Sequence, residues 1–135
     1  MKWDYNRWPN FAPLELSCKD GSALPLELTG VPEFLDRLQK MRTIFGAPIK
    51  ISSGYRSPEY NAKVSTTGND GPHTYGRAVD IIIFGDKALK LINIAIDLGF
   101  TGVGISQKGD VNNRFIHLDD LTNDIHKPRP WLWSY

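Results

Sequence analysis

The chain has 135 residues, a formal net charge of +1 and one cysteine, and these values exclude several classes of protein. The length is typical of one domain with a single core, and a monomer is the default expectation. Lys and Arg are scattered rather than clustered, so we expect no nucleic-acid partner and no binding to anionic membranes. Cys18 alone can form no intrachain disulfide, and no segment approaches the about 20 apolar residues of a membrane span.

The beginning of the chain differs in composition from the rest. Residues 1–30 are rich in Trp, Pro and polar residues, and we expect them to wrap over a core formed by residues 31–135. Within this wrap, Phe11, Leu14 and Leu16 indicate a clamp or a short strand rather than a periodic helix. We interpret the whole chain as one domain.

Hydrophobic periodicity and turn residues predict the remaining elements. Helices are predicted in residues 32–45 and 57–64, where Pro or an N-capping Ser stands at the helix start, and in residues 87–98, where an amphipathic pattern ends at Gly99. Strands are predicted in residues 48–53, 78–84, 102–106 and 114–119, the last two joined by a turn at 108–113. This order favours an α+β fold whose mainly antiparallel sheet has helices packed on one face, which leaves the other face free for a cleft.

Two of the predicted strands carry a polar residue among apolar neighbours. Asp80 interrupts the apolar run of residues 78–84, and His117 lies within Phe115-Ile-His-Leu118. An unpaired carboxylate at such a position is costly, so another group must compensate it. A divalent cation shared with His73, in a Gly- and Pro-rich segment, would satisfy all three groups. Two histidines and one aspartate leave one tetrahedral position open, which is typical of a catalytic zinc site.

A simpler interpretation of the same residues remains open. A single histidine in a strand is more often a core or surface residue with ordinary hydrogen bonds than a metal ligand. Asp80 could be a structural carboxylate paired with Arg77 or Arg56, in a protein that binds no metal. The pattern of residues does not decide between these interpretations.

Three ordered motifs resemble the M15 family of zinc peptidases. They are Ser53-Gly-Tyr-Arg-Ser-Pro-Glu-Tyr-Asn61, His73-x-x-Gly-x-Ala-Val-Asp80 and Phe115-Ile-His-Leu-Asp119. This family contains D-alanyl-D-alanine carboxypeptidases and phage or bacterial murein endopeptidases, and it shares its fold with the hedgehog signalling domain. Each motif alone is weak, whereas the three in order make a specific match that extends over most of the chain.

The resemblance implies a site and a substrate. It implies that His73, Asp80 and His117 bind Zn²⁺, and that the protein hydrolyses a peptide bond in the stem peptide or cross-bridge of peptidoglycan. The family includes both carboxypeptidases and endopeptidases, and the motifs do not distinguish them. The resemblance therefore implies a zinc metallopeptidase with the peptidoglycan stem peptide as its partner.

The first motif supplies residues for substrate binding and catalysis. The resemblance implies that Arg56 reaches into the cleft and holds a substrate carboxylate or carbonyl, with Tyr55 as a neighbouring substrate-binding residue. A guanidinium suits this role because its planar fork of donors fits a carboxylate. The alternative is that Arg56 is a surface arginine braced by Glu59.

The general base is the point at which this chain departs from the family. Members often supply a glutamate three residues before the last histidine ligand, or another histidine close before it, but this chain has Arg114 and Asn112 there. Asp119 is our candidate base, because it points to the same side of its strand as His117. The equal alternative is that Asp119 accepts a hydrogen bond that orients an imidazole. Arg114 could help stabilise an oxyanion.

The end of the chain carries several aromatic residues, Trp131, Trp133 and Tyr135. We interpret them as a terminal clamp that packs on the core, with stacking on a sugar as the alternative. We predict no strand in this segment.

Two further expectations concern the whole protein. Residues 1–9 lack the apolar core of a secretory signal, so we expect cytosolic synthesis, followed by release or delivery to the cell wall. The resemblance then implies a phage-type endolysin or a virion-associated hydrolase. The alternative function is a zinc-bearing binding module that keeps the fold and the metal but hydrolyses nothing, which the missing glutamate favours.

Overall fold

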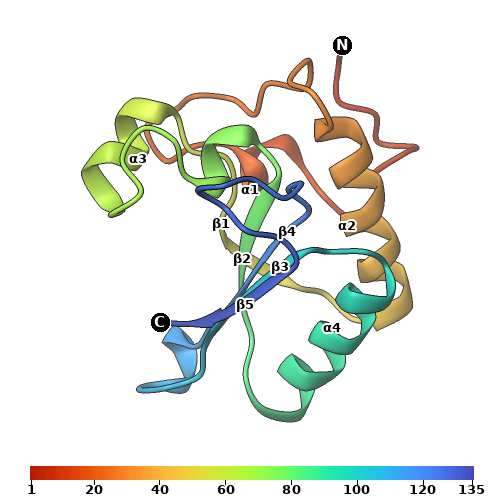
Figure 1. Ribbon diagram of the computed structural model, residues 1–135. Coiled ribbons are helices and arrows are strands. Elements are labelled where there is room, and N and C mark those ends of the chain that lie inside the picture. Colours follow the sequence, from red (N-terminus) through yellow and green to blue (C-terminus); the bar gives the residue numbers. More distant parts are fainter.

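A five-stranded sheet in the order β1-β2-β4-β3-β5 forms the centre of the computed structural model, which describes residues 1–135 (Figure 1). The strands are β1 (Lys50–Ser53), β2 (Ala78–Ile82), β3 (Gly102–Ser106), β4 (Phe115–Asp119) and β5 (Trp131–Ser134). Neighbouring strands are antiparallel except β3 and β5, which are parallel. The predicted α+β fold with a mainly antiparallel sheet is confirmed.

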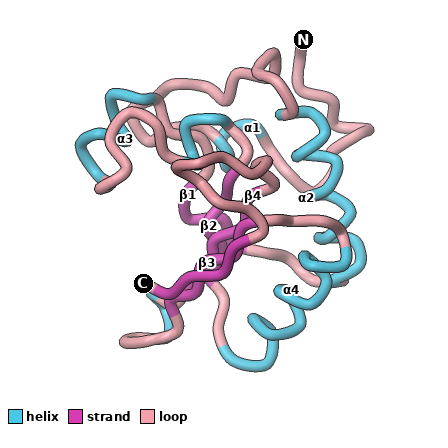
Figure 2. The backbone as a smooth tube through the Cα atoms, viewed as in Figure 1, coloured by secondary structure: helices cyan, strands magenta, loops and turns pink.

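The two long helices cover one face of the sheet, as Figures 1 and 2 show. The helices are α1 (Pro13–Leu16), α2 (Val31–Phe45), α3 (Pro58–Val64) and α4 (Gly85–Asp97), with single 3₁₀ turns η1 (Pro72–Tyr75) and η2 (Val111–Asn113). The three helices predicted from periodicity and caps correspond to α2, α3 and α4. No helix combines the length and the apolar character needed to cross a membrane.

The sheet face beneath α2 and α4 is apolar. It presents Val79 and Ile81 of β2, Ile116 and Leu118 of β4, and Val103 of β3, all buried in one cluster of 21 residues. Fully burying each aliphatic side chain of this kind stabilises the fold by roughly 1.5–3 kcal/mol. Because side chains alternate along a strand, these residues direct their immediate neighbours to the opposite face.

The opposite face carries two rows of residues that run across the strands. One row contains Ser53, Asp80, His117, Gly104 and Trp133, one residue from each strand in register. The next row contains Ala78, Asp119, Gly102 and Trp131. The face that the helices leave free therefore carries two of the three predicted metal ligands and Asp119.

One element of the N-terminal wrap differs from its prediction. The segment from Pro13 to Leu16 is helix α1, so the predicted clamp or short strand is wrong. Pro13 suits the first helical position because its φ is already helical and no amide hydrogen bond is lost there. The Glu15 carboxylate accepts a hydrogen bond from the Ala12 amide at 2.7 Å. Leu14 is 85% exposed, so the two leucines do not share a buried face as a strand would require.

The aromatic tail also differs from its prediction, because it forms strand β5 beside β3. The Trp131 amide donates to the Thr101 carbonyl at 2.9 Å, and the Tyr135 amide donates to the Ile105 carbonyl at 3.1 Å. Alternate residues therefore share one face of this strand. Trp131 and Tyr135 remain 55% and 52% exposed, so they do not act as a buried clamp.

Two glycines of β3 make room on the free face of the sheet. A Cβ atom at Gly104 would lie 2.6 Å from Nε1 of Trp133, and one at Gly102 would lie 2.6 Å from Nε of Arg129. Both distances are well inside van der Waals contact. Only glycine at these positions lets Trp133 and Arg129 lie directly against β3.

We expect Gly104→Ala to lower the free energy of unfolding by about 1–3 kcal/mol, because the new methyl group overpacks against the Trp133 indole. Denaturant unfolding of the wild-type protein and the variant measures this loss. If the clash with Trp133 is the cause, Gly104→Ala should cost less in a Trp133→Ala background than in the wild type. Equal costs in the two backgrounds would contradict this explanation.

Candidate metal centre

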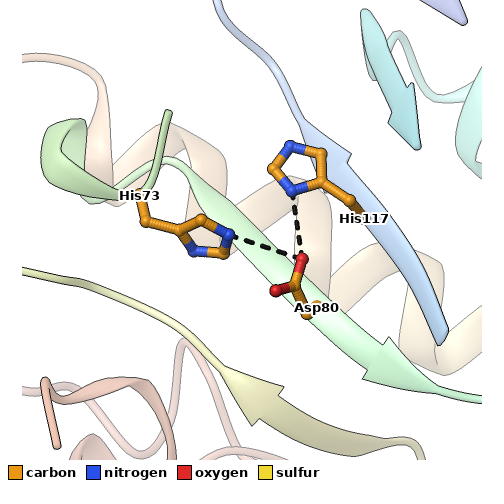
Figure 3. Close-up of side chains that lie close together, drawn as sticks. All are labelled: His73, Asp80 and His117. Carbon is orange, nitrogen blue, oxygen red and sulfur yellow. Dashed lines mark hydrogen bonds and ion pairs between the residues drawn. The ribbon is translucent and has the colours of Figure 1, made fainter. Parts of the chain in front are cut away.

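His73, Asp80 and His117 converge from η1, β2 and β4 on one point of the free sheet face (Figure 3). The Oδ1 atom of Asp80 lies 3.4 Å from Nε2 of His73 and 3.0 Å from Nδ1 of His117. One potential ligand atom from each residue lies within 4.8 Å of the others, and all three residues are buried. The structure thus brings together the three residues that the sequence singled out.

The spacing of these atoms fits a tetrahedral ion. Ligand atoms bound at about 2.0–2.1 Å in tetrahedral geometry lie about 3.3 Å from one another. The distances of 3.4 and 3.0 Å to Asp80 Oδ1 are close to this value. Two imidazole nitrogens and one carboxylate oxygen form a donor set that suits zinc and leaves one position open.

His73 is held by the loop that follows β1. Its Nδ1–H donates to the Gly54 carbonyl at 2.7 Å, and its own carbonyl accepts a hydrogen bond from the Arg56 amide at 3.1 Å. A proton on Nδ1 leaves the Nε2 lone pair free, and this is the atom that faces Asp80. The Ser-Gly-Tyr-Arg motif therefore orients the first histidine as well as contributing Arg56.

His117 is held by the buried carboxylate of Asp119, which is held in turn by the guanidinium of Arg129. Its Nε2–H donates to Oδ2 of Asp119 at 2.7 Å, which leaves the Nδ1 lone pair to face Asp80. Arg129 donates from Nε to Oδ1 and from Nη2 to Oδ2 of Asp119, both at 2.8 Å. Asp119 is 0% exposed. These contacts favour the interpretation in which Asp119 orients the imidazole over the one in which it acts as the base.

The pKa values of the group follow from burial and from these contacts. Burial lowers the pKa of His73. Burial also opposes the charged form of His117, but hydrogen bonds with Asp119 and Asp80 outweigh it and raise that pKa. For Asp80, burial is likewise outweighed by hydrogen bonds with the two histidines, which hold the carboxyl pKa well below its usual range. His117 and Arg129 together lower the pKa of Asp119 to about 2.

A cavity of about 420 Å³ opens above the three residues. Arg56 lines it, and its Nη2 lies 3.7 Å from Oδ2 of Asp80. The Nη1 group donates to Oδ1 of Asn61 at 3.2 Å, so the guanidinium is held by Asn61 rather than by Glu59. The geometry leaves Arg56 with donors available to a ligand in the cavity.

Other candidate residues lie elsewhere. Tyr55 lines a separate cavity of about 600 Å³ along β1, which Arg56 also lines, and does not line the metal cavity. Arg77 pairs with Asp120 at 2.8 Å, so it cannot be the partner of Asp80. Arg114 donates to the Gly109 carbonyl at 3.0 Å and also lies outside the metal cavity. The structure therefore does not bring Tyr55 or Arg114 to the site.

Sequence reasoning missed three residues of the site's surroundings. Arg129 forms the ion pair that fixes Asp119, while Trp133 and Tyr135 line the metal cavity. The ring of Trp133 lies 5.0 Å from that of His117, centroid to centroid. The alternation of aromatic residues at positions 131, 133 and 135 was the available signal for a strand here.

The family model of peptidase M15 matches residues 9–119. The chain belongs to the peptidase M15 family. The matched span contains all three residues of the candidate metal centre and Asp119, and it ends before Arg129 and β5. No curated protein and no solved structure matches the chain. Membership of this family implies a metallopeptidase with a peptide substrate, which agrees with a buried group able to bind a metal ion.

We expect Asp119→Asn to weaken zinc binding by about 10–100-fold, because the variant removes the charged acceptor that fixes the His117 tautomer. Competition with a chromophoric chelator measures the affinity. Asp124→Asn, in the exposed loop that follows, is the matched control and should bind zinc as the wild type does. An unchanged affinity in Asp119→Asn would show that this carboxylate does not orient the ligand.

The two histidines should also give the metal-free protein a stability maximum near pH 6.5, the ordinary pKa of unfolded histidine. The raised pKa of His117 stabilises the fold below that pH, and this contribution is lost as the pH rises through the folded-state value. The lowered pKa of His73 acts in the opposite direction, because stability is lost as the pH falls below 6.5. Denaturant unfolding with chelator present, between pH 5 and 9, measures the free energy of unfolding on both sides of this maximum, and we call the two sides the limbs of the pH profile.

Each single-proton limb has a slope of at most about 1.4 kcal/mol per pH unit. The His117→Gln variant should lose the limb above pH 6.5 and keep the one below it. Stability that stays flat above pH 6.5 in the wild-type protein would contradict the assignment of a raised pKa to His117.

Proposed function

We propose that this M15 family protein is a zinc-dependent peptidase that hydrolyses a peptide bond in the stem or cross-bridge of peptidoglycan. The observation that carries the proposal is the convergence of His73, Asp80 and His117 at the base of an open cavity, with the spacing of a tetrahedral site. The family supports the reaction class, and the wall substrate is supported by the three motifs shared with murein peptidases.

Zinc bound by this set would supply Lewis acidity, which polarises a carbonyl and lowers the pKa of a coordinated water to about 7. The protein's own contribution begins with the two imidazoles. His73 presents Nε2 and His117 presents Nδ1 because each ring donates its other N–H to a fixed acceptor. This preorganisation spares the site a rearrangement of its ligands when substrate binds.

Arg56 is the group that binds the substrate. Its guanidinium lines the cavity beside Asp80 and has donors beyond the one used by Asn61. A planar fork of charged donors fits a substrate carboxylate or the oxygen that gains charge during hydrolysis. The site therefore favours a peptide that carries a carboxylate close to the scissile bond.

Proton transfer needs an acceptor that reaches the cavity. Asp80 is the only carboxylate among the residues that line it. Its Oδ1 faces both imidazoles, whose hydrogen bonds hold the carboxyl pKa well below its usual range, and its Oδ2 faces Arg56, so Asp80 suits the role of metal ligand rather than that of general base. Asp119, our candidate base from sequence, does not line the cavity and serves instead to hold His117.

The second candidate function is a zinc-bearing binding module. One observation favours it: position 114 holds an arginine that points out of the cavity where many family members have a glutamate. Such a module would bind zinc with the same residues and leave peptides intact.

The experiment that separates these functions is digestion of purified peptidoglycan with the zinc-loaded protein. We expect new amino groups to appear, to disappear when zinc is removed by a chelator, and to return when zinc is restored. His73→Ala should lose both zinc and activity. Stoichiometric zinc without any release of amino groups, where a known murein peptidase works, would support the binding module instead.

A second comparison separates metal binding from substrate binding. Arg56→Ala should retain zinc and lower kcat/KM by about 100-fold or more, a loss typical of removing a group that stabilises developing charge. Arg114→Ala removes an arginine outside the cavity and should change neither quantity. Loss of zinc in Arg56→Ala would overturn this division of roles.

A further inference from the structure

Strand β5 presents a row of three aromatic residues beside the metal centre. Trp131, Trp133 and Tyr135 are spaced by two residues, so they share the sheet face that carries Asp80 and His117. Trp131 and Tyr135 are more than half exposed, which a purely structural strand at the edge of a sheet does not require. The row lies beyond the matched residues 9–119, and metal binding does not account for it.

The row borders two adjoining cavities. Tyr135 lines the metal cavity, Trp131 lines a second cavity of about 440 Å³, and Trp133 lines both. Thr67 and Pro72 are also shared by the two cavities. Trp133 is fixed between them, because it packs against His117 and occupies the space left by the missing side chain of Gly104. A ligand long enough to pass Trp133 would occupy both cavities.

The charged groups of the second cavity already have partners. Lys127 pairs with Asp70 at 2.9 Å and lies over the Tyr75 ring. Arg129, also in its lining, is held by both oxygens of Asp119. An ionic group of a ligand would have to compete with these pairs. The cavity is therefore poorly suited to a carboxylate or an ammonium group.

Apart from these pairs, the lining offers an exposed indole face and two uncharged polar side chains. Trp131 offers the apolar face, and Thr67 and His126 offer hydrogen-bonding groups near it. A neutral ring with apolar C–H faces and hydroxyl or amide groups at its rim complements this arrangement, because it covers the aromatic face without bringing a charge. A sugar ring has these properties.

We propose that the second cavity binds an amino-sugar ring of the glycan strand, stacked on Trp131, while the attached peptide passes Trp133 into the metal cavity. This inference rests on the proposed function, since it places both parts of a peptidoglycan fragment on one surface. Trp131 is then a specificity residue for sugar-bearing substrates, and it takes no part in metal binding.

The test compares two substrates that differ only in the sugar. One is a stem peptide attached to its amino-sugar disaccharide, and the other is the same peptide without it. Trp131→Ala should lower kcat/KM about tenfold on the first substrate and leave the second unchanged. Leu132→Ala is the matched control, because Leu132 is 65% exposed on the other face of β5 and should leave both substrates unaffected.

Other outcomes would overturn the inference. Equal losses on the two substrates would mean that Trp131 only supports the fold, and no loss on either would mean that no sugar reaches it. A direct binding measurement is independent of hydrolysis. Titration with tri-N-acetylglucosamine, followed by tryptophan fluorescence, should show saturable binding that Trp131→Ala loses and Leu132→Ala keeps.

The two proposals fail in different ways. A protein that binds the trisaccharide through Trp131 but cleaves no peptide would retain the sugar site and exclude the peptidase. A protein that cleaves both substrates equally well and does not bind the trisaccharide would retain the peptidase and overturn the sugar site.

Discussion

The rest of the site depends on a buried carboxylate placed between two imidazoles. Asp80 and His117 are partners in the register of β2 and β4, so the pairing of two apolar strands brings their side chains together. Without a cation at this point, hydrogen bonds with Asp119 and Asp80 raise the pKa of His117 despite its burial, so a proton on this ring compensates part of the charge of Asp80. A metal ion that replaces that proton satisfies the same carboxylate and both imidazoles at once. The apolar residues on the other face of the same strands hold this arrangement in register.

The matched family region and the tail contribute different parts of the site. The three candidate ligands and Asp119 lie within residues 9–119, whereas Arg129, Trp133 and Tyr135 come from the tail. The two parts fit together because β3 has no side chains at positions 102 and 104. Arg129 reaches Asp119 across one gap, and Trp133 reaches His117 across the other. The glycines of one strand thus connect the tail to the metal centre.

Sequence predicted those features that are determined locally. The apolar periodicity of α2 and α4 predicts which of their side chains are buried. The polar interruptions of two apolar runs likewise identify Asp80 and His117 as buried polar residues. The roles of Tyr55 and Asp119 are harder to predict from sequence. The direction of a loop residue such as Tyr55, and the role of a strand carboxylate such as Asp119, depend on residues that are distant in the chain. The loop after Gly54 directs Tyr55 toward the cavity along β1. Arg129, ten residues along the chain, decides how Asp119 is used. Helix α1 likewise depends on tertiary contacts that no local pattern shows, whereas the alternating aromatic residues of β5 are a local signal for a strand.

The position of Arg56 carries the strongest physical reason to expect an anionic ligand. It lies 3.7 Å from Asp80 and is 19% exposed in its side chain, held there by Asn61. When a divalent cation is bound to Asp80, that single carboxylate cannot neutralise both the ion and the guanidinium. The excess positive charge favours a ligand that brings its own negative charge, whether a carboxylate or an oxygen that becomes charged during hydrolysis. A purely structural zinc site has no need of this second cation, whereas a peptidase that holds a carboxylate-bearing peptide uses it in every turnover.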